Sequence, residues 1–155
     1  VSGSAYGAKN GDYLSRAHLY GAKFGVAFGT AVTIILVAFA PQLATLFAYT
    51  KETAVLVPEI TRFLRIASLC LPLTGAGMTS SFMYQGIGRG TISLMWTIIR
   101  EVIFTVTATY TLGIILGWGL VGIWTGLALG RTLASILNFA FARFTIRKVR
   151  EKFGT

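Results

Sequence analysis

The stretch FGVAFGTAVTIILVAFAPQLATLF, residues 24–47, contains no charged residue. A helix of roughly 20 apolar residues is long enough to cross the hydrocarbon core of a bilayer, which is about 30 Å thick. Three more long apolar runs follow, at 66–84, 91–118 and 120–142. The sequence therefore predicts an all-α, polytopic membrane protein with four transmembrane helices.

The composition supports a membrane protein. Of the 155 residues, 54% are hydrophobic and only 12% are charged, whereas soluble domains average about 25% charged residues. The net charge of +9 is concentrated near the predicted helix ends. Without a basic face or an aromatic stacking platform outside the apolar runs, this charge indicates contact with anionic lipid headgroups rather than with nucleic acid.

We expect four membrane helices with a segment before them and a tail after them. Residues 1–13 are expected to form the end of a preceding helix and a cytoplasmic loop, and residues 143–155 a basic cytoplasmic tail. The expected transmembrane helices are 14–47, 56–85, 91–116 and 120–142. Because the chain begins without Met or a leader pattern, we expect it to be the interior of a longer protein.

Positive charge predicts the orientation of these helices. One side of the membrane carries Lys9, Arg16, Lys23, Arg89 and five basic residues of the tail. The opposite side carries Lys51, countered by Glu52 and Glu59, together with Arg62 and Arg65, which weaken the bias without reversing it. Because cytoplasmic loops are enriched in Lys and Arg, both ends of the chain are predicted to be cytoplasmic.

Three charged residues interrupt the last two apolar runs. Arg100 lies about 13 Å into its helix, near the bilayer midplane, and Arg131 lies at a similar depth. Glu101 and Arg131 could meet, because their helices are antiparallel neighbours, so we predict an ion pair between them. Arg100 and Glu101 are adjacent and point to different faces of a helix, so we do not expect them to satisfy each other fully. The charges either hold helices together, or Glu101 takes part in proton or cation coupling.

Four residues of the second predicted helix are candidates for a cavity or a gate: Pro72, Gln85, Arg62 and Arg65. Helices interrupted by Pro and Gly often border binding cavities, because freed backbone groups need partners there. The alternative for Pro72 is a simple kink that serves helix packing. The alternative for the two arginines is that they anchor the helix at the membrane interface. The only histidine, His18, is expected to be solvated in an interfacial turn.

The sequence predicts neither an enzyme nor a metal site. It contains no Ser/His/Asp set, no paired acids and no phosphate-loop pattern. The single cysteine, Cys70, offers no metal-ligand spacing. We therefore assign no catalytic residue and no metal ligand.

Three stretches resemble the MATE family of multidrug and toxic compound extrusion transporters. GAKNGDYLSRA (7–17) is similar to the cytoplasmic loop after that family's eighth helix. LPLTGAGMTSSFMYQGIGRG (71–90) is similar to the tenth helix and the turn after it, with Pro72, Gln85, Gly86 and Gly88 matching a recurrent pattern. IIREVIF (98–104) resembles the eleventh helix of prokaryotic members. The resemblance covers the whole chain, from the end of helix eight through helix twelve.

The resemblance implies a twelve-helix transporter of two six-helix lobes, in which this chain forms part of the C-terminal lobe. Such a protein would lie in the plasma membrane of a prokaryote and export cationic or amphipathic drugs and toxins in antiport with Na⁺ or H⁺. Its partners would be the lipid bilayer, the missing N-terminal lobe and the small-molecule substrate. No cofactor besides the coupling ion is expected.

One departure from the family's pattern affects the coupling site. Some members use acidic residues in the seventh and tenth helices, but residues 66–85 contain no acid. Either Glu101 substitutes, or the coupling acid lies in the missing part. Two other functions remain open: a flippase for lipid-linked oligosaccharides of the same superfamily, and a small four-helix membrane adaptor.

Overall fold

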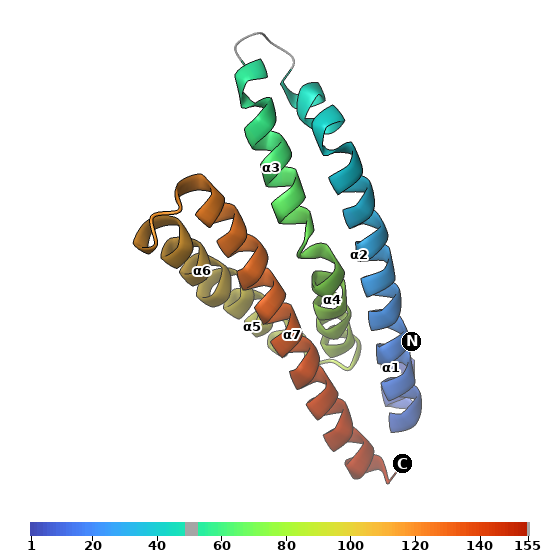
Figure 1. Ribbon diagram of the computed structural model, residues 1–155. Coiled ribbons are helices and arrows are strands. Elements are labelled where there is room, and N and C mark those ends of the chain that lie inside the picture. Colours follow the sequence, from blue (N-terminus) through green and yellow to red (C-terminus); the bar gives the residue numbers. More distant parts are fainter. Residues whose placement is uncertain (49–52, 155) are drawn as a thin grey trace.

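The computed structural model describes residues 1–48 and 53–154, and within these ranges it contains helices and no strand. In chain order the helical elements are α1 (Ser2–Gly7), α2 (Gly11–Phe47), η1 (Ala54–Leu56), α3 (Val57–Ser68), α4 (Leu71–Gly86), α5 (Gly90–Ile98), η2 (Ile99–Val106), α6 (Thr107–Tyr110), η3 (Thr111–Ile115) and α7 (Gly119–Phe153) (Figure 1). The predicted all-α fold is confirmed. Among the described residues, three stretches are long and apolar enough to span a membrane: Gly11–Phe47, Gly90–Ile115 and Gly119–Phe153.

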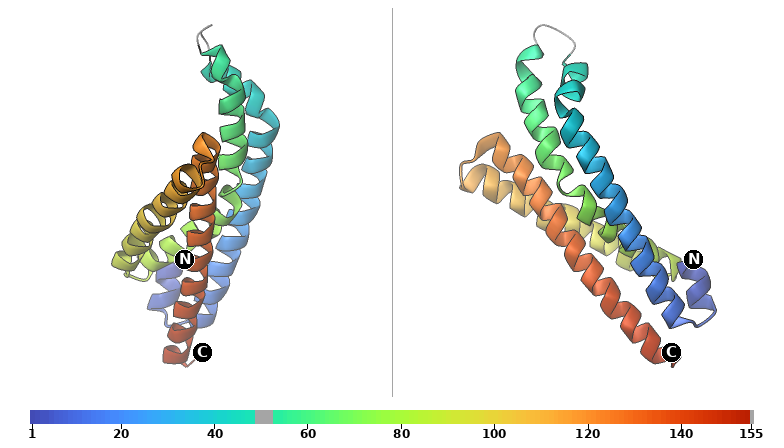
Figure 2. Two further views of the ribbon diagram at one scale, coloured as in Figure 1. Left: turned by 60° about the vertical axis from the view of Figure 1, so that its left-hand side comes forward. Right: turned by 45° about the vertical axis from the view of Figure 1, so that its right-hand side comes forward.

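The helices form two long antiparallel pairs. Helix α2 runs beside α3 and α4, and α7 runs beside the stretch from α5 to η3 (Figures 1 and 2). The start of α2 and the end of α7 lie at the same end of the molecule, where Asp12 forms an ion pair with Arg150. The hydrophobic core is concentrated at this end, around Leu14, Tyr84 and Ile146. Elsewhere many large apolar side chains are exposed, as expected for surfaces that face lipid or further membrane helices.

Glycines allow α2 and α4 to touch through their backbones. Gly21, Gly25 and Gly29 recur every four residues on α2 and therefore share one face. A Cβ atom at Gly25 would lie 2.9 Å from the carbonyl oxygen of Gly75, and one at Gly75 would lie 2.5 Å from the carbonyl oxygen of Gly25. Any side chain at either position would therefore force the two helices apart. Small residues at membrane helix contacts permit this close approach.

A second glycine row holds α7 against the helix that precedes it. Gly122, Gly126 and Gly130 also recur every four residues. A Cβ atom on any of them would lie less than 3 Å from backbone atoms of η2, α6 or η3. Asn138 of α7 joins the two pairs, because its Nδ2 donates hydrogen bonds of 3.0 Å to the carbonyl oxygen of Gly77 and to Ser81 Oγ, both on α4.

The single helix expected over 56–85 is instead two helices, α3 and α4, separated at Leu69 and Cys70. Pro72 causes the break, because its ring excludes the carbonyl of the residue four positions earlier and it has no N–H to donate. The carbonyl freed in this way belongs to Ser68, which is buried. Thr33 of α2 supplies a donor: its Oγ1 lies 2.8 Å from the Ser68 oxygen and shares its one proton with the Gly29 oxygen of its own helix at 2.9 Å. A neighbouring helix thus satisfies the broken backbone, as a membrane interior requires.

Other helix boundaries in the structure also differ from those expected from the sequence. The expected tail at 143–155 is not separate from the last helix, since α7 continues to Phe153 without Pro or Gly to stop it. The helix expected over 91–116 begins at Gly90 and becomes π-helical in η2 and η3. Lys51 and Glu52, which enter the orientation argument, lie outside the described residues, as does Thr155.

The contact between Gly25 and Gly75 predicts opposite effects for two identical substitutions. Gly→Ala in a helix normally stabilises by up to about 1 kcal/mol. At Gly25 the added methyl meets backbone, so Gly25→Ala should destabilise by about 1–3 kcal/mol. Gly7→Ala, where a Cβ would meet nothing within 4 Å, should leave stability unchanged or raise it. Thermal unfolding of the purified protein in detergent measures both, and equal midpoints for the two variants would contradict the packing.

The bond from Thr33 to Ser68 predicts that Thr33→Val destabilises the break between α3 and α4. Valine has the shape of threonine but cannot donate, so a buried carbonyl loses its partner at a cost of about 1–3 kcal/mol. Thr30→Val on the same helix is the control, because exposed Thr30 bonds only the Val26 carbonyl of its own helix. The same unfolding assay should show a lower midpoint for Thr33→Val alone.

Candidate functional site

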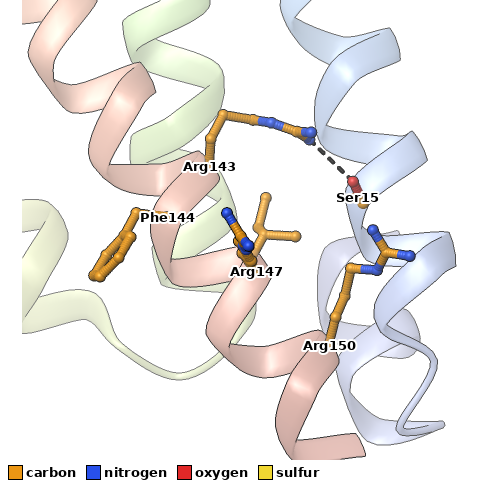
Figure 3. A pocket seen from close by; sticks show the side chains of 6 residues that line it. Ser15, Arg143, Phe144, Arg147 and Arg150 are labelled. Atoms are coloured by element: carbon orange, nitrogen blue, oxygen red, sulfur yellow. Dashed lines mark hydrogen bonds between the residues drawn. The ribbon is translucent and has the colours of Figure 1, made fainter. Parts of the chain in front are cut away.

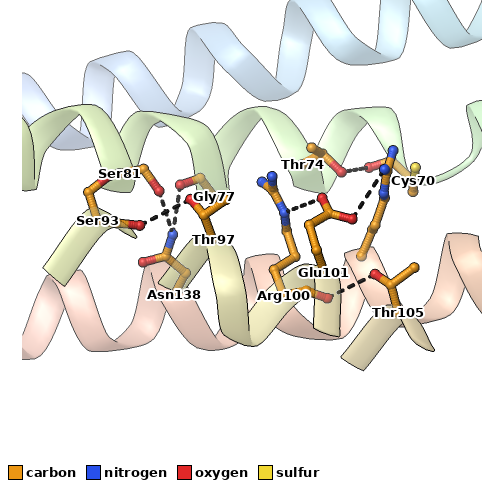
Figure 4. A network of polar contacts seen from close by, with 11 residues as sticks. Cys70, Thr74, Gly77, Ser81, Ser93, Thr97, Arg100, Glu101, Thr105 and Asn138 are labelled. Atoms are coloured by element: carbon orange, nitrogen blue, oxygen red, sulfur yellow. Dashed lines mark hydrogen bonds and ion pairs between the residues drawn. The ribbon is translucent and has the colours of Figure 1, made fainter. Parts of the chain in front are cut away.

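The three charged residues of the apolar runs form one cluster. Arg100 Nε lies 3.1 Å from Glu101 Oε1, and Arg131 Nη2 lies 3.3 Å from Glu101 Oε2. Each carboxylate oxygen therefore accepts from a different arginine, and η2 is linked to α7 (Figure 4). The predicted ion pair between Glu101 and Arg131 is present.

Arg100 contacts Glu101, although the sequence analysis placed these neighbours on different faces of a helix. Arg100 does not satisfy Glu101 alone, because Glu101 also pairs with Arg131. Both residues lie in η2, which is π-helical. Its hydrogen bonds join residues five apart, so a turn holds more residues than in an α-helix and adjacent side chains are separated by a smaller angle. Thr105 follows this geometry, since its Oγ1 donates to the Arg100 carbonyl at 2.9 Å. The long arginine side chain covers the remaining distance.

Gly130 brings the two helices of the cluster into contact. A Cβ atom there would lie 2.7 Å from the Phe104 carbonyl oxygen and 2.8 Å from Thr105 Cα. The backbone of α7 therefore touches η2 one residue before Arg131. This contact sets the separation across which Arg131 reaches Glu101.

The cluster is partly buried and carries a net charge of +1. The side chains of Arg100, Glu101 and Arg131 are 20%, 37% and 39% exposed, respectively. Two arginines surround one carboxylate, and Arg131 Nε is buried without a hydrogen-bond partner. A cation approaching Glu101 would meet this excess of positive charge, so both arginines would have to move before the carboxylate could bind it.

A second polar set, centred on Asn138, lies near the cluster on the helices α4, α5 and α7 (Figure 4). Besides its two donated bonds, Asn138 has a buried Oδ1 without a partner, and the buried Ser135 Oγ one turn away also lacks one. Buried polar atoms are normally satisfied, so such atoms call for a water molecule, a ligand or a further helix.

The remaining predicted residues lie apart from the cluster. Pro72 begins α4 at the break. Gln85 lies at the end of α4, where its Nε2 donates to Ser93 Oγ at 3.1 Å and thereby holds the turn to α5. Arg62 and Arg65 are exposed on α3, and within residues 1–48 and 53–154 neither forms an ion pair.

His18 is not in a solvated turn, as the sequence analysis expected, but almost fully buried, with 1% exposure. Its Nε2 lies 3.0 Å from Ser80 Oγ on α4, and its ring stacks on Phe139 of α7. The early start of α2, at Gly11, places His18 two turns inside the helix. The only sequence signal for this burial is its spacing of four from Leu14 and Ala22, which are also buried.

A groove of about 440 Å³ lies between α2, α4 and α7. Its lining is almost entirely apolar and includes Val26, Leu73 and Phe139, with Lys23 among the lining residues. Such a surface can receive an apolar molecule or another helix. Among the described residues, no group of three His, Cys, Asp or Glu side chains could hold a metal ion.

Comparison with known proteins identifies the family. A model of the MatE family matches residues 1–111, and a search of curated proteins finds no match. The chain is 36% identical to a multidrug resistance MATE family transporter of the MOP superfamily in an inward-facing conformation, with a TM-score of 0.94, covering 97% of this chain and 34% of that one. An outward-facing structure described in the same words gives 36% identity and a TM-score of 0.91, covering 97% and 33%.

A third structure is a MOP superfamily transporter from Pyrococcus furiosus Vc1 (DSM3638), described as having a binding pocket of reverse polarity that suggests a different function. Identity is 36% and the TM-score is 0.93, covering 97% of this chain and 33% of that one. The chain thus spans about a third of the length of these structures. The family predicted from sequence is confirmed: this chain belongs to the MatE family, whose members in these structures are membrane transporters of the MOP superfamily.

Proposed function

We propose that this chain forms part of the C-terminal lobe of a secondary active transporter that exports cationic or amphipathic compounds in antiport with Na⁺ or H⁺. A second lobe of the same polypeptide completes the cavity. In this arrangement α2 is the first membrane helix, and α3 and α4 together form the second. The stretch from α5 to η3 forms the third, and α7 is the fourth. The protein lies in a prokaryotic plasma membrane.

The observation that carries this proposal is the likeness to both inward-facing and outward-facing transporters. The TM-scores are 0.94 and 0.91, and each comparison covers 97% of the chain. The four-helix unit therefore has nearly the same internal shape in both states. This constancy supports alternating access in which lobes move as bodies around a central site.

The position of the basic residues supports cytoplasmic ends. Arg89, Lys148 and Lys152 line one pocket, although Arg89 is far from the other two in sequence. The turn from α4 to α5 and the end of α7 therefore share one side, as do the starts of α1 and α2. An excess of Lys and Arg on one side is typical of cytoplasmic surfaces.

The charged cluster acts in this proposal as a link between helices of the lobe. Glu101 compensates two arginines that would otherwise be unpaired among apolar helices. Losing one member of a buried ion pair costs more than losing both, because it leaves an uncompensated charge. The alternative is that Glu101 itself exchanges the coupling ion during transport.

Ethidium efflux from drug-sensitive cells that produce the full-length protein tests the proposal. Wild type should lower cellular ethidium, and varying sodium at fixed pH should identify the coupling ion. Glu101→Gln should lose most efflux, by roughly tenfold or more, since removal of a paired charge costs several kcal/mol before allowance for partial exposure. Glu151→Gln, which removes a carboxylate from an exposed pair with Arg147, is the matched control. Absence of efflux by wild type, at normal expression, would contradict the proposed function.

The double variant Glu101→Gln/Arg131→Gln separates the two roles of the cluster. If Glu101 links helices, removing one charge of each sign restores efflux toward wild type, because the net charge of the cluster stays at +1. If Glu101 exchanges the coupling ion, the double variant remains as inactive as the single one. Protein levels in the membrane, measured for each variant, control for misfolding.

A second candidate function is the translocation of an anionic, lipid-linked sugar. The net positive cluster favours it, as do Arg62 and Arg65, which form no ion pair among the described residues. The likeness to a transporter described as having a pocket of reverse polarity also favours it. Failure of ethidium efflux together with an intact membrane protein would favour this candidate. A four-helix adaptor has no specific observation in its favour.

A further inference from the structure

Three arginines of α7 converge beside the start of α2. A pocket of about 360 Å³ is lined there by Arg143, Arg147 and Arg150, together with Ser15 of α2 (Figure 3). Arg143 and Arg150 reach from α7 toward α2 on either side of Ser15 (Figure 3). These arginines follow directly after the apolar run that ends at residue 142. The pocket therefore lies at the depth where hydrocarbon gives way to headgroups.

The acidic residues nearby neutralise this pocket only in part. Asp12 pairs with a terminal nitrogen of Arg150, and Glu151 pairs with Arg147 at 3.5 Å. Arg147 and Glu151 are 81% and 68% exposed, so solvent screens their attraction and an anion can compete for the guanidinium. Arg143 has no acidic partner among the described residues, and its Nη1 donates to the Ser15 hydroxyl at 3.0 Å.

Hydrogen-bonding capacity remains unused in the pocket. Arg150 Nε is buried and has no hydrogen-bond partner in residues 1–48 and 53–154. Ser15 Oγ accepts from Arg143 and keeps its own proton to donate. Guanidinium groups have no acceptor and bind phosphate oxygens through pairs of donors. The unused donors at this pocket therefore match a phosphate group, with its several acceptor oxygens, and do not match a cation.

We infer that this pocket binds the phosphate group of an anionic phospholipid and so fixes the cytoplasmic ends of α2 and α7 at the membrane surface. A soluble phosphate ion offers the same oxygens, but the lipid fits the position better, because the pocket lies at the bilayer boundary and Phe144 and Ile146 add apolar lining. This inference concerns lipid binding and does not depend on what the protein transports.

Native mass spectrometry of the full-length protein, released from detergent, tests this site. Titration with phosphatidylglycerol should give bound lipid on wild type, whereas phosphatidylcholine, which has the same phosphodiester but no net charge, should bind much less. The variant Arg143→Gln/Arg147→Gln/Arg150→Gln should bind phosphatidylglycerol at least roughly tenfold more weakly, since each basic residue contributes to attraction of anionic lipid. The control Lys9→Gln/Arg16→Gln/Lys152→Gln removes the same charge from the same side outside the pocket, and should retain binding.

Two further measurements distinguish a local lipid site from misfolding and from binding of free phosphate. Arg147→Gln alone removes an exposed side chain whose only ion pair among the described residues is with Glu151, so the protein should fold and bind the lipid a few-fold more weakly. Inorganic phosphate at millimolar concentration should not displace the lipid. Equal losses in the two triple variants would overturn a local site and leave only general charge attraction. Displacement by inorganic phosphate would overturn the lipid as the source of the phosphate group.

Discussion

Close contact between helix backbones, permitted by glycine, is the constraint on which the rest of this structure depends. Gly25 and Gly75 let α2 touch α4, and this approach places Thr33 where it can satisfy the carbonyl freed by Pro72. Gly130 lets α7 touch η2, and this approach places Arg131 within 3.3 Å of Glu101. In both cases a polar group inside an apolar layer finds a partner on a neighbouring helix, because lipid cannot supply one.

These contacts bear on how the unit behaves during transport. Backbone contacts leave no space for helices to slide or rotate against each other without first separating, and packed helices change arrangement in discrete steps rather than gradually. The likeness to both inward-facing and outward-facing relatives agrees with this view. In the transporter proposed above, the cycle would then require motion between lobes, while the charged cluster and the hydrogen bonds of Asn138 keep their geometry.

The sequence predicted the membrane fold and one ion pair of the charged cluster. The features that it did not predict depend on local backbone geometry. Four long apolar runs predicted the all-α membrane fold, and the antiparallel order of the last two helices predicted the pair of Glu101 with Arg131. The contact of Arg100 with Glu101 was not predictable, because it requires a π-helical backbone that residue type does not reveal. The sequence left open whether Pro72 interrupts the helix or only kinks it, since the partner that Thr33 provides for the freed carbonyl is far away in the sequence. The burial of His18 depends on where α2 begins.

A distance measurement tests whether this unit keeps one internal arrangement while the proposed transporter changes state. Nitroxide labels at the exposed positions Ile34→Cys on α2 and Val106→Cys on η2 would report the separation of the two helix pairs. Pulsed electron paramagnetic resonance would measure it in the full-length protein, with and without a transported drug and at high and low sodium. A unit that moves as one body gives one distance distribution under all conditions. A second distance that appears with drug or sodium would contradict it.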